Sequence, residues 1–228
     1  MAQSVLVIAD SGSGKSTSMR NLDPKETFII NIANKPLPFK GWKKNYTLIS
    51  KDNPKGNMTA TSSSAGIIKA IQHVNDKMPH IKNLVIDDWQ YMSSFEYFDR
   101  ANEKGYDKFT QIAANLAQVA KMPKDLREDL YVFFLTHSEE STDVNGHRKV
   151  KAKTIGKMID NTLTLEGLFS IVLFGRVKKT EDSLEYGFDT VKKGKWEFHS
   201  WYTDGMEGGK RREKEYASNF KKKENVKH

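Results

Sequence analysis

The chain begins with a short apolar segment that runs directly into a glycine-containing loop, and this junction constrains the fold more than any other feature. Residues 4–8 are hydrophobic apart from Ser4, and the following loop ends in Gly14, Lys15 and Ser16. Glycines let a loop curl so that successive backbone amides point inward, where a lysine ammonium can meet the outer phosphates of a nucleotide. The sequence therefore predicts a strand, a phosphate-binding loop and a helix that starts near Lys15.

The loop supplies the candidate nucleotide-binding residues. The Ser16 hydroxyl is expected to hold magnesium beside the phosphates. Ala9 stands where the usual pattern has its first glycine, and alanine is compatible with the turn if the backbone keeps a negative φ there. The alternative is a Gly-Ser turn that only joins a strand to a helix, with no ligand. The predicted cofactor-binding set is Ser11, Gly12, Ser13, Gly14, Lys15, Ser16 and Thr17.

A second apolar segment ends in two carboxylates. Residues 84–86 are Leu, Val and Ile, and Asp87 and Asp88 follow directly. This is a Walker B pattern, and we expect its strand to lie beside the loop strand. Asp87 is expected to hold magnesium together with Ser16, and Asp88 is the nearest group to polarise an attacking water. The alternative is that these acids cap the helix that begins near Trp89.

Strand and helix patterns alternate along the first 136 residues, which is βαβ order. Several strands are apolar on both faces, and such strands lie inside a mostly parallel sheet with helices on both sides. A nucleotide is then expected at the carboxyl ends of the strands. The expected strands are 5–8, 27–32, 46–50, 84–87, 130–136, 169–177, 186–191 and 196–201, the last three in antiparallel hairpins, and the expected helices are 64–78, 88–103, 107–122 and a short one near 155–161.

Length and composition predict one α/β domain with a tail. At 228 residues the chain can bury a full core, and we place the domain at residues 1–207 and a basic, flexible tail at 208–228. The absence of cysteine excludes disulfides, thiolate zinc sites and cysteine nucleophiles. No apolar run approaches the roughly 20 residues of a membrane span, so we expect a soluble, cytoplasmic protein.

The positive charge indicates polyanionic partners. The net charge is +8, and residues 205–228 carry half of it. The tail is interpreted either as an arm for nucleic acid or for a single-strand-binding or replication protein, or as a solubilising extension. A basic segment after residue 138 gives the candidate nucleic-acid contacts Arg148, Lys149, Lys151 and Lys153. If extended, this segment would direct alternate lysines along a single strand, although lysines also protect exposed strand edges.

Polar residues end the strand at 130–136. Thr136 closes the apolar run and His137 follows it. A polar side chain at this point can respond to the γ-phosphate and pass its state to the next loop, so both residues are candidate sensors. The alternative for His137 is an ordinary local hydrogen bond.

Several segments together resemble phage-encoded RecA-like nucleotide-binding proteins, among them single-strand annealing and recombination ATPases. The resemblance covers roughly residues 4–180 and implies a RecA-like P-loop NTPase core, with ATP and Mg²⁺ bound at a subunit interface of a ring or filament. It also implies that single-stranded DNA binds loops near 92–108 and 138–153. The segments that carry it are the phosphate-binding loop, residues 31–38 (NIANKPLP), 84–88 (LVIDD), 134–137 (FLTH) and 154–157 (TIGK).

The resemblance also has a departure and a missing part. RecA-type enzymes place a catalytic glutamate after the second strand, where this chain offers Asn34, an amide that cannot act as a general base. Either Asp88 takes that role or hydrolysis is slow. An interfacial site further needs a cation from the neighbouring subunit, and Lys157, Arg176 and Lys178 are the candidates.

These observations predict a magnesium-dependent ATPase stimulated by single-stranded DNA that acts in phage recombination, by annealing or pairing strands. Two alternatives remain at this stage. One is a non-catalytic, ATP-gated helicase loader or recombination mediator, which Asn34 favours. The other is a small-molecule kinase, which usually needs an arginine-rich lid, whereas arginines here are few and scattered.

Overall fold

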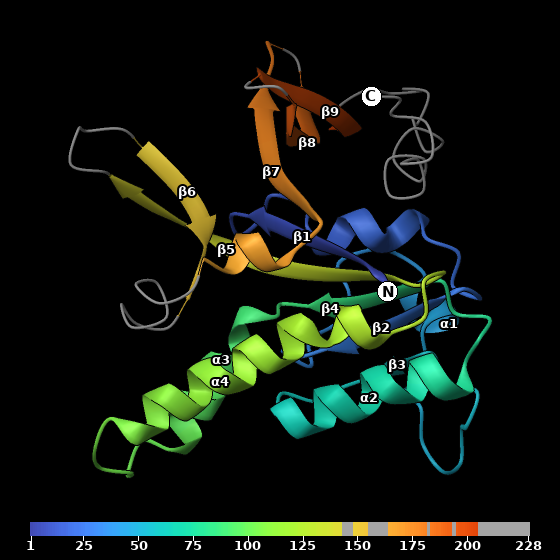
Figure 1. Ribbon diagram of the computed structural model, residues 1–228. Coiled ribbons are helices and arrows are strands. Elements are labelled where there is room, and N and C mark those ends of the chain that lie inside the picture. Colours follow the sequence, from blue (N-terminus) through green and yellow to red (C-terminus); the bar gives the residue numbers. More distant parts are fainter. Residues whose placement is uncertain (143–147, 155–163, 182, 193–194, 205–228) are drawn as a thin grey trace.

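The computed structural model describes residues 1–142, 148–154, 164–181, 183–192 and 195–204, and shows one large sheet flanked by helices (Figure 1). The predicted tail, the expected short helix near 155–161 and Lys157 lie outside these ranges. The strands are β1 (Gln3–Ala9), β2 (Thr27–Asn31), β3 (Met58–Thr59), β4 (Asn83–Asp87), β5 (Tyr131–Thr142), β6 (Arg148–Ala152), β7 (Ile171–Lys179), β8 (Leu184–Lys192) and β9 (Lys195–Asp204). The helices are η1 (Ser16–Asn21), α1 (Trp42–Asn45), α2 (Ser64–Lys77), α3 (Gln90–Asp99), α4 (Asp107–Lys121), η2 (Met122–Asp125) and η3 (Leu165–Leu168).

The sheet has the strand order β3-β2-β4-β5-β1-β7-β8-β9, and β6 pairs with β5 outside this path. The pairs from β3 to β7 are parallel, whereas β7, β8 and β9 pair antiparallel, as predicted for the C-terminal part. The expectation that the Walker B strand lies beside the loop strand is wrong, because β5 separates β4 from β1. The connection through α3 and α4 decides this order, and the hydrophobic pattern of a strand does not encode which neighbour it pairs with.

The central strands are buried on both faces, as their composition predicts. In β1, Leu6 and Ile8 belong to the core cluster that contains the apolar residues of α2, α3 and α4. Val5 and Val7 point to the opposite face, in the cluster that contains Met19 of η1. Side chains alternate along a strand, so one apolar strand fills both cores, and the sheet lies as the middle layer of three.

Two predicted helices are close to their expected bounds. The helix expected at 64–78 is α2, and its N-terminus is capped by Ser63, whose hydroxyl accepts a hydrogen bond from the amide of Gly66 at 3.2 Å. The helix expected at 107–122 is α4. Its buried residues include Ile112, Leu116 and Val119, at the three- and four-residue spacing of one helix face. Within the described ranges every helix is too short or too polar to span a lipid bilayer.

The strand expected at residues 46–50 is wrong. This segment forms only an isolated bridge between Leu48 and Met58, and the edge strand beside β2 is β3. Side-chain amides take over much of the local bonding: Asn53 donates to the Leu48 carbonyl at 2.9 Å and Asn57 donates to the Asn45 carbonyl at 2.9 Å. Asparagine side chains that bond to nearby backbone groups favour turns over ladders, which explains the difference.

Candidate functional site

Strand register brings the predicted site residues to one edge of the sheet. β1 pairs with β5 so that Ala9 lies opposite His137, and β4 pairs with β5 so that Ile86 lies opposite Phe134. The carboxyl ends of these three strands therefore meet, and a pocket of about 420 Å³ opens there between the phosphate-binding loop, Asp88 and His137. The nucleotide site is at the position that a parallel α/β sheet predicts.

The loop has the backbone that its glycines allow. Gly12 and Gly14 have φ values of 77° and 86°, which side-chain-bearing residues rarely adopt. Ala9 ends strand β1 and is not among the described positive-φ residues, as its replacement of glycine requires. Ser13 departs from the predicted set, because it does not line the pocket and its hydroxyl donates to the Asp10 carbonyl at 2.6 Å. Its role is to hold the turn.

The helix expected from Lys15 is shorter than predicted. It is the 3₁₀ helix η1, six residues long, and it ends where Leu22 becomes extended. Asp23 precedes Pro24, and a proline disfavours helical backbone at the residue before it. The helix therefore cannot continue through Asp23. Phosphate binding therefore depends on the loop amides and Lys15 more than on the dipole of a long helix.

Lys15 lies at the centre of the pocket and is 6% exposed. Its Nζ donates to the carbonyls of Ala9 and Asp10, both at 3.0 Å, and lies 3.4 Å from Nδ1 of His137. Burial lowers the pKa of the Lys15 ammonium, and the carboxylates of Asp88 and Asp87 partly oppose that shift. The phosphates of a nucleotide would add further negative charge and stabilise the ammonium at this position.

The proposed magnesium ligands contact each other. The Ser16 hydroxyl donates to Oδ1 of Asp87 at 2.8 Å, and Asp87 is 1% exposed. Mg²⁺ prefers oxygen ligands and usually binds one or two carboxylates together with substrate phosphates, so this pair fits the ion. No cluster of three or more His, Cys, Asp or Glu side chains suited to a metal occurs among the described residues.

Asp88 does not cap the following helix. It has a left-handed φ of 60°, and the N-cap of α3 is Trp89, which makes no side-chain capping bond. The Asp88 carboxylate, 2% exposed, instead forms an ion pair with Lys35, and its Oδ1 lies 3.5 Å from Nε2 of His137. Burial alone would raise the pKa of Asp88, but the hydrogen bonds with His137 and Lys35 outweigh it and lower the pKa. Held in this way, Asp88 is a poor proton acceptor.

His137 joins the phosphate-binding lysine to the second carboxylate. Since the Lys15 ammonium can only donate, Nδ1 of His137 accepts, and the ring proton then lies on Nε2 facing Asp88. These contacts place His137 between Lys15 and Asp88, and its role as a sensor of the outer phosphates stays a prediction. Thr136 lies elsewhere: it is 1% exposed, lines a neighbouring pocket, and its hydroxyl has no hydrogen-bond partner within the described chain.

The three candidate interfacial cations are Lys157, Arg176 and Lys178, and the two on strand β7, Arg176 and Lys178, do not line the nucleotide pocket. Arg176 of β7 lies outside the nucleotide pocket, and its Nε donates to Oδ2 of Asp189 at 2.7 Å. It borders a third pocket on the other side of the loop, beside Gly12 and Ser13. Lys157 is outside the described residues. The chain's own pocket therefore takes no cation from Arg176, and a role toward a neighbouring subunit stays a prediction.

The candidate nucleic-acid residues lie on or next to strand β6. The segment is extended as predicted, with Ala152 in the core and Val150 packed against it. Lys151 alternates with these residues and thus lies on the opposite face, and Lys153 follows the strand in an exposed position. Arg148 and Lys149 are the first two residues of the strand. Glu139 of β5 lies opposite Lys151 in the register. β6 is also a sheet edge, so both interpretations of these lysines fit the structure.

The pocket includes side chains that were not predicted as site residues, namely Arg20, Lys35, Pro36, Pro38 and Tyr186. Lys35 comes from the loop after β2, inside a segment that carried the family resemblance, and Tyr186 comes from β8. A local pattern could have marked Lys35, since it follows the second strand as Asp88 follows β4 and strand ends of a parallel sheet converge. Nothing near Tyr186 in the sequence indicates that an antiparallel strand reaches the loop.

Magnesium binding should depend on pH through Asp87. Burial and the neighbouring negative charge of Asp88 raise the pKa of Asp87 to about 6, against a smaller opposing effect of the Ser16 hydrogen bond. Metal binding needs the ionised carboxylate, so magnesium affinity, measured by titration with bound nucleotide, should fall about tenfold per pH unit below pH 6. Asp87→Asn should lack this component and serves as the control.

The metal-free protein should respond in the opposite direction. Because the pKa of Asp87 is higher in the folded than in the unfolded state, this group stabilises the fold increasingly as pH falls from about 6 toward 4. Above pH 6 the buried charge opposes folding. Thermal unfolding without metal at pH 5 and pH 8, compared between wild type and Asp87→Asn, isolates this contribution; an identical pH response of both proteins would contradict the shift.

Comparison with known proteins agrees with this geometry. Residues 1–203 match the family model described as an AAA domain. A KaiC-like protein from the archaeon Pyrococcus horikoshii has a similar solved structure, with a TM-score of 0.46 and 13% identity over 87% of this chain and 83% of that one. No curated protein sequence gives a significant match. The predicted fold class, an α/β P-loop NTPase core with antiparallel C-terminal strands, is confirmed. The chain belongs to the AAA domain family and is a nucleotide-binding P-loop NTPase of the ATPase type.

Proposed function

We propose that this NTPase hydrolyses ATP with Mg²⁺ and couples the reaction to single-stranded DNA, acting in phage recombination by annealing or pairing strands. Lys15 and the loop amides would hold the phosphates, and Ser16 and Asp87 would hold the metal ion, whose charge polarises the phosphoryl group when bound. Asp88 is the proposed acceptor of the proton from the attacking water, a role for which its contact with Lys35 would have to be released, since that contact lowers its pKa. Assembly of several copies into a ring or filament is part of this proposal.

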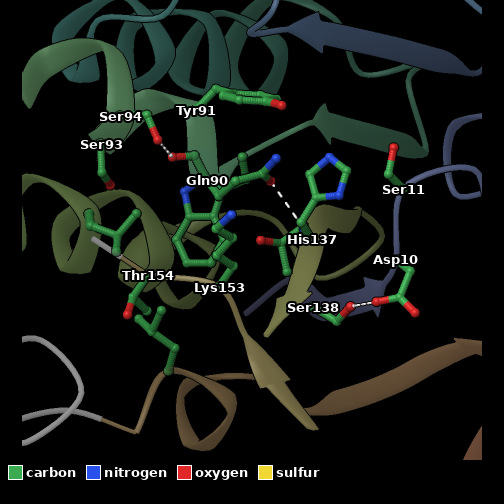
Figure 2. Close-up of a pocket in the computed structure, with 14 residues that line it drawn as sticks. Asp10, Ser11, Gln90, Tyr91, Ser93, Ser94, His137, Ser138, Lys153 and Thr154 are labelled. Atoms are coloured by element: carbon green, nitrogen blue, oxygen red, sulfur yellow. Dashed lines mark hydrogen bonds between the residues drawn. The ribbon is translucent and has the colours of Figure 1, made fainter. Parts of the chain in front are cut away.

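One observation carries the coupling to DNA. His137 lines the nucleotide pocket and also a second pocket, of about 370 Å³, on its other side. Figure 2 shows this second pocket, where the backbone amide of His137 donates to Oε1 of Gln90 at 3.2 Å. Gln90 begins helix α3 directly after the two aspartates. A change in the position of His137 would therefore alter both pockets.

The second pocket is bordered by the two segments that the resemblance assigns to DNA. Tyr91, Ser93 and Ser94 come from α3. Ser138 comes from β5, and Lys153 directly follows β6. Hydroxyl groups, an aromatic ring and an exposed lysine suit the backbone and bases of a single strand, with little sequence preference. Figure 1 shows β6 and the end of β5 extending together away from the rest of the sheet.

The proposal predicts that DNA accelerates hydrolysis. ATP turnover should rise when single-stranded DNA is added, and DNA binding should tighten with ATP. Replacing both Lys151 and Lys153 by alanine should reduce the slope of log K against log salt by about 0.7 for each lost phosphate contact. The matched control replaces Lys69 and Lys77, two exposed lysines of α2, by alanine.

The outcomes separate the parts of the proposal. Stimulation by DNA that disappears in Lys15→Ala would support a DNA-coupled ATPase and lead to annealing assays. An equal salt slope in the lysine pair variant and its control would make β6 a protected sheet edge. Hydrolysis without DNA binding or stimulation would remove the recombination role and leave the ATPase.

A second candidate function is an ATP-gated module that binds another protein, such as a helicase loader or mediator. It is favoured by the state of Asp88, whose pKa is lowered through Lys35 and His137, and by the exposed amide of Asn34 after β2. Both features predict slow hydrolysis. Tight ATP-dependent binding of a replication protein with turnover near the uncatalysed rate would favour this function over the first.

A further inference from the structure

Lys35 lies in a line of polar and charged groups across the nucleotide pocket. Nζ of Lys15 lies 3.4 Å from Nδ1 of His137, Nε2 of His137 lies 3.5 Å from Oδ1 of Asp88, and the other oxygen of Asp88 forms the ion pair with Lys35. The two lysines thus stand at opposite ends of the line, and all four residues line the same pocket. The pocket therefore has cations that the phosphate-binding loop does not supply, namely Lys35 and also Arg20 of η1.

The position of Lys35 is fixed by its own loop. The buried side-chain amide of Asn31 donates to the Lys35 carbonyl at 2.7 Å and accepts from the Lys35 amide at 3.4 Å. Asn34 adopts a left-handed φ of 49°, and Pro36 restricts the backbone of the residue before it. The backbone of Lys35 is thereby held while its side chain can move.

The two partners of the ion pair differ in exposure. The side chain of Asp88 is 2% exposed, whereas that of Lys35 is 48% exposed and faces the pocket. The hydrogen bond and charge of Asp88 outweigh the effect of burial and raise the pKa of Lys35, so its ammonium is charged at neutral pH. An ammonium has three donors and can exchange a carboxylate for a phosphate without leaving the pocket.

We propose that Lys35 binds the γ-phosphate of ATP from within the same chain and leaves Asp88 in order to do so. The proposal rests on the nucleotide site of the proposed function and gives it a means to distinguish ATP from ADP. ADP lacks the terminal phosphate, so Lys35 stays on Asp88. With ATP, Lys35 moves to the terminal phosphate, and Asp88 keeps its contact with His137.

The test compares binding of ADP with that of a non-hydrolysable ATP analogue, to the full chain in the presence of Mg²⁺. Lys35→Ala should weaken the analogue about tenfold and change ADP affinity by less than about twofold, since a charge-assisted bond is lost only with the triphosphate. Lys35→Arg should restore most of the preference. Lys40→Ala, an exposed lysine of the same region, should match wild type.

A second pair of variants tests the same contact if Lys35→Ala does not fold. If Lys35→Ala leaves Asp88 unpaired and fails to fold, the double variant Lys35→Gln/Asp88→Asn has no lone buried charge and is compared with Asp88→Asn alone. Asp88→Asn should bind the analogue at least as tightly as wild type, because Lys35 is released from the carboxylate. The double variant should lose the preference for the analogue over ADP.

Each result bears on one proposal. Equal losses for ADP and the analogue, or no loss for either, would overturn the γ-phosphate contact and leave a structural ion pair. If the wild-type protein binds the analogue through Lys35 but does not hydrolyse ATP, the proposed ATPase activity is contradicted and the γ-phosphate contact of Lys35 is supported. Normal hydrolysis by Lys35→Ala, with an unchanged preference for the analogue over ADP, would contradict the γ-phosphate contact of Lys35 and leave the ATPase proposal standing.

Discussion

Lys15→Ala is expected to abolish nucleotide-dependent activity, with hydrolysis lowered about 10²–10³-fold and triphosphate binding strongly weakened. In the structure Lys15 is the buried cation of the phosphate-binding loop, bonded to the carbonyls of Ala9 and Asp10 and in contact with His137. Alanine removes the charge that meets the outer phosphates and takes one hydrogen-bond donor from each of those carbonyls. Turnover of ATP and equilibrium binding of an ATP analogue measure the effect.

The control for this prediction is Lys25→Ala, since Lys25 is exposed in the turn before β2. Its turnover and nucleotide binding should equal those of wild type. Circular dichroism and thermal unfolding of Lys15→Ala should show a folded protein. Wild-type nucleotide affinity in Lys15→Ala would contradict the site as described, because Lys15 is the cation that the phosphate-binding loop itself supplies to the pocket.

Asp87→Asn should separate activity from stability. The amide keeps the size of the carboxylate and can still accept from the Ser16 hydroxyl, which lies 2.8 Å from Oδ1. The negative charge for Mg²⁺ is lost, so magnesium-dependent hydrolysis should fall about 10²–10³-fold. The pKa of Asp87 is raised to about 6 by burial, so the ionised form opposes folding, and metal-free Asp87→Asn should be more stable at pH 8 by on the order of 1–3 kcal/mol.

Opposite changes in activity and stability are the result that a metal ligand predicts and a structural residue does not. Denaturant unfolding without metal and steady-state turnover over a range of magnesium concentrations provide the two measurements. Asp52→Asn, in an exposed loop, should alter neither. A destabilised Asp87→Asn that keeps its magnesium dependence would show that Asp87 serves the fold alone.

The sequence determined the parts of the molecule that depend on local chemistry. The run from Val5 to Ile8 and the Gly-Lys-Ser ending predicted β1 and the loop, because positive φ at Gly12 and Gly14 and a strand apolar on both faces leave few other arrangements. The pairing of Ser16 with Asp87 also followed, since Ser16 closes the loop after β1 and Asp87 ends β4, and both lie at the same edge of the sheet. Helices α2 and α4 followed from their apolar periodicity.

Tertiary structure decided the features that depend on which segments become neighbours. The placement of β5 between β1 and β4 brings His137 against Lys15 and Asp88, and strand patterns contain no information about that order. The ion pair of Asp88 with Lys35 joins residues from different loops, and it replaced the capping role that the sequence near Trp89 allowed. Local sequence thus determines which groups can bind phosphate and metal, whereas long-range packing determines which charge each buried carboxylate faces, because that partner comes from a distant part of the chain.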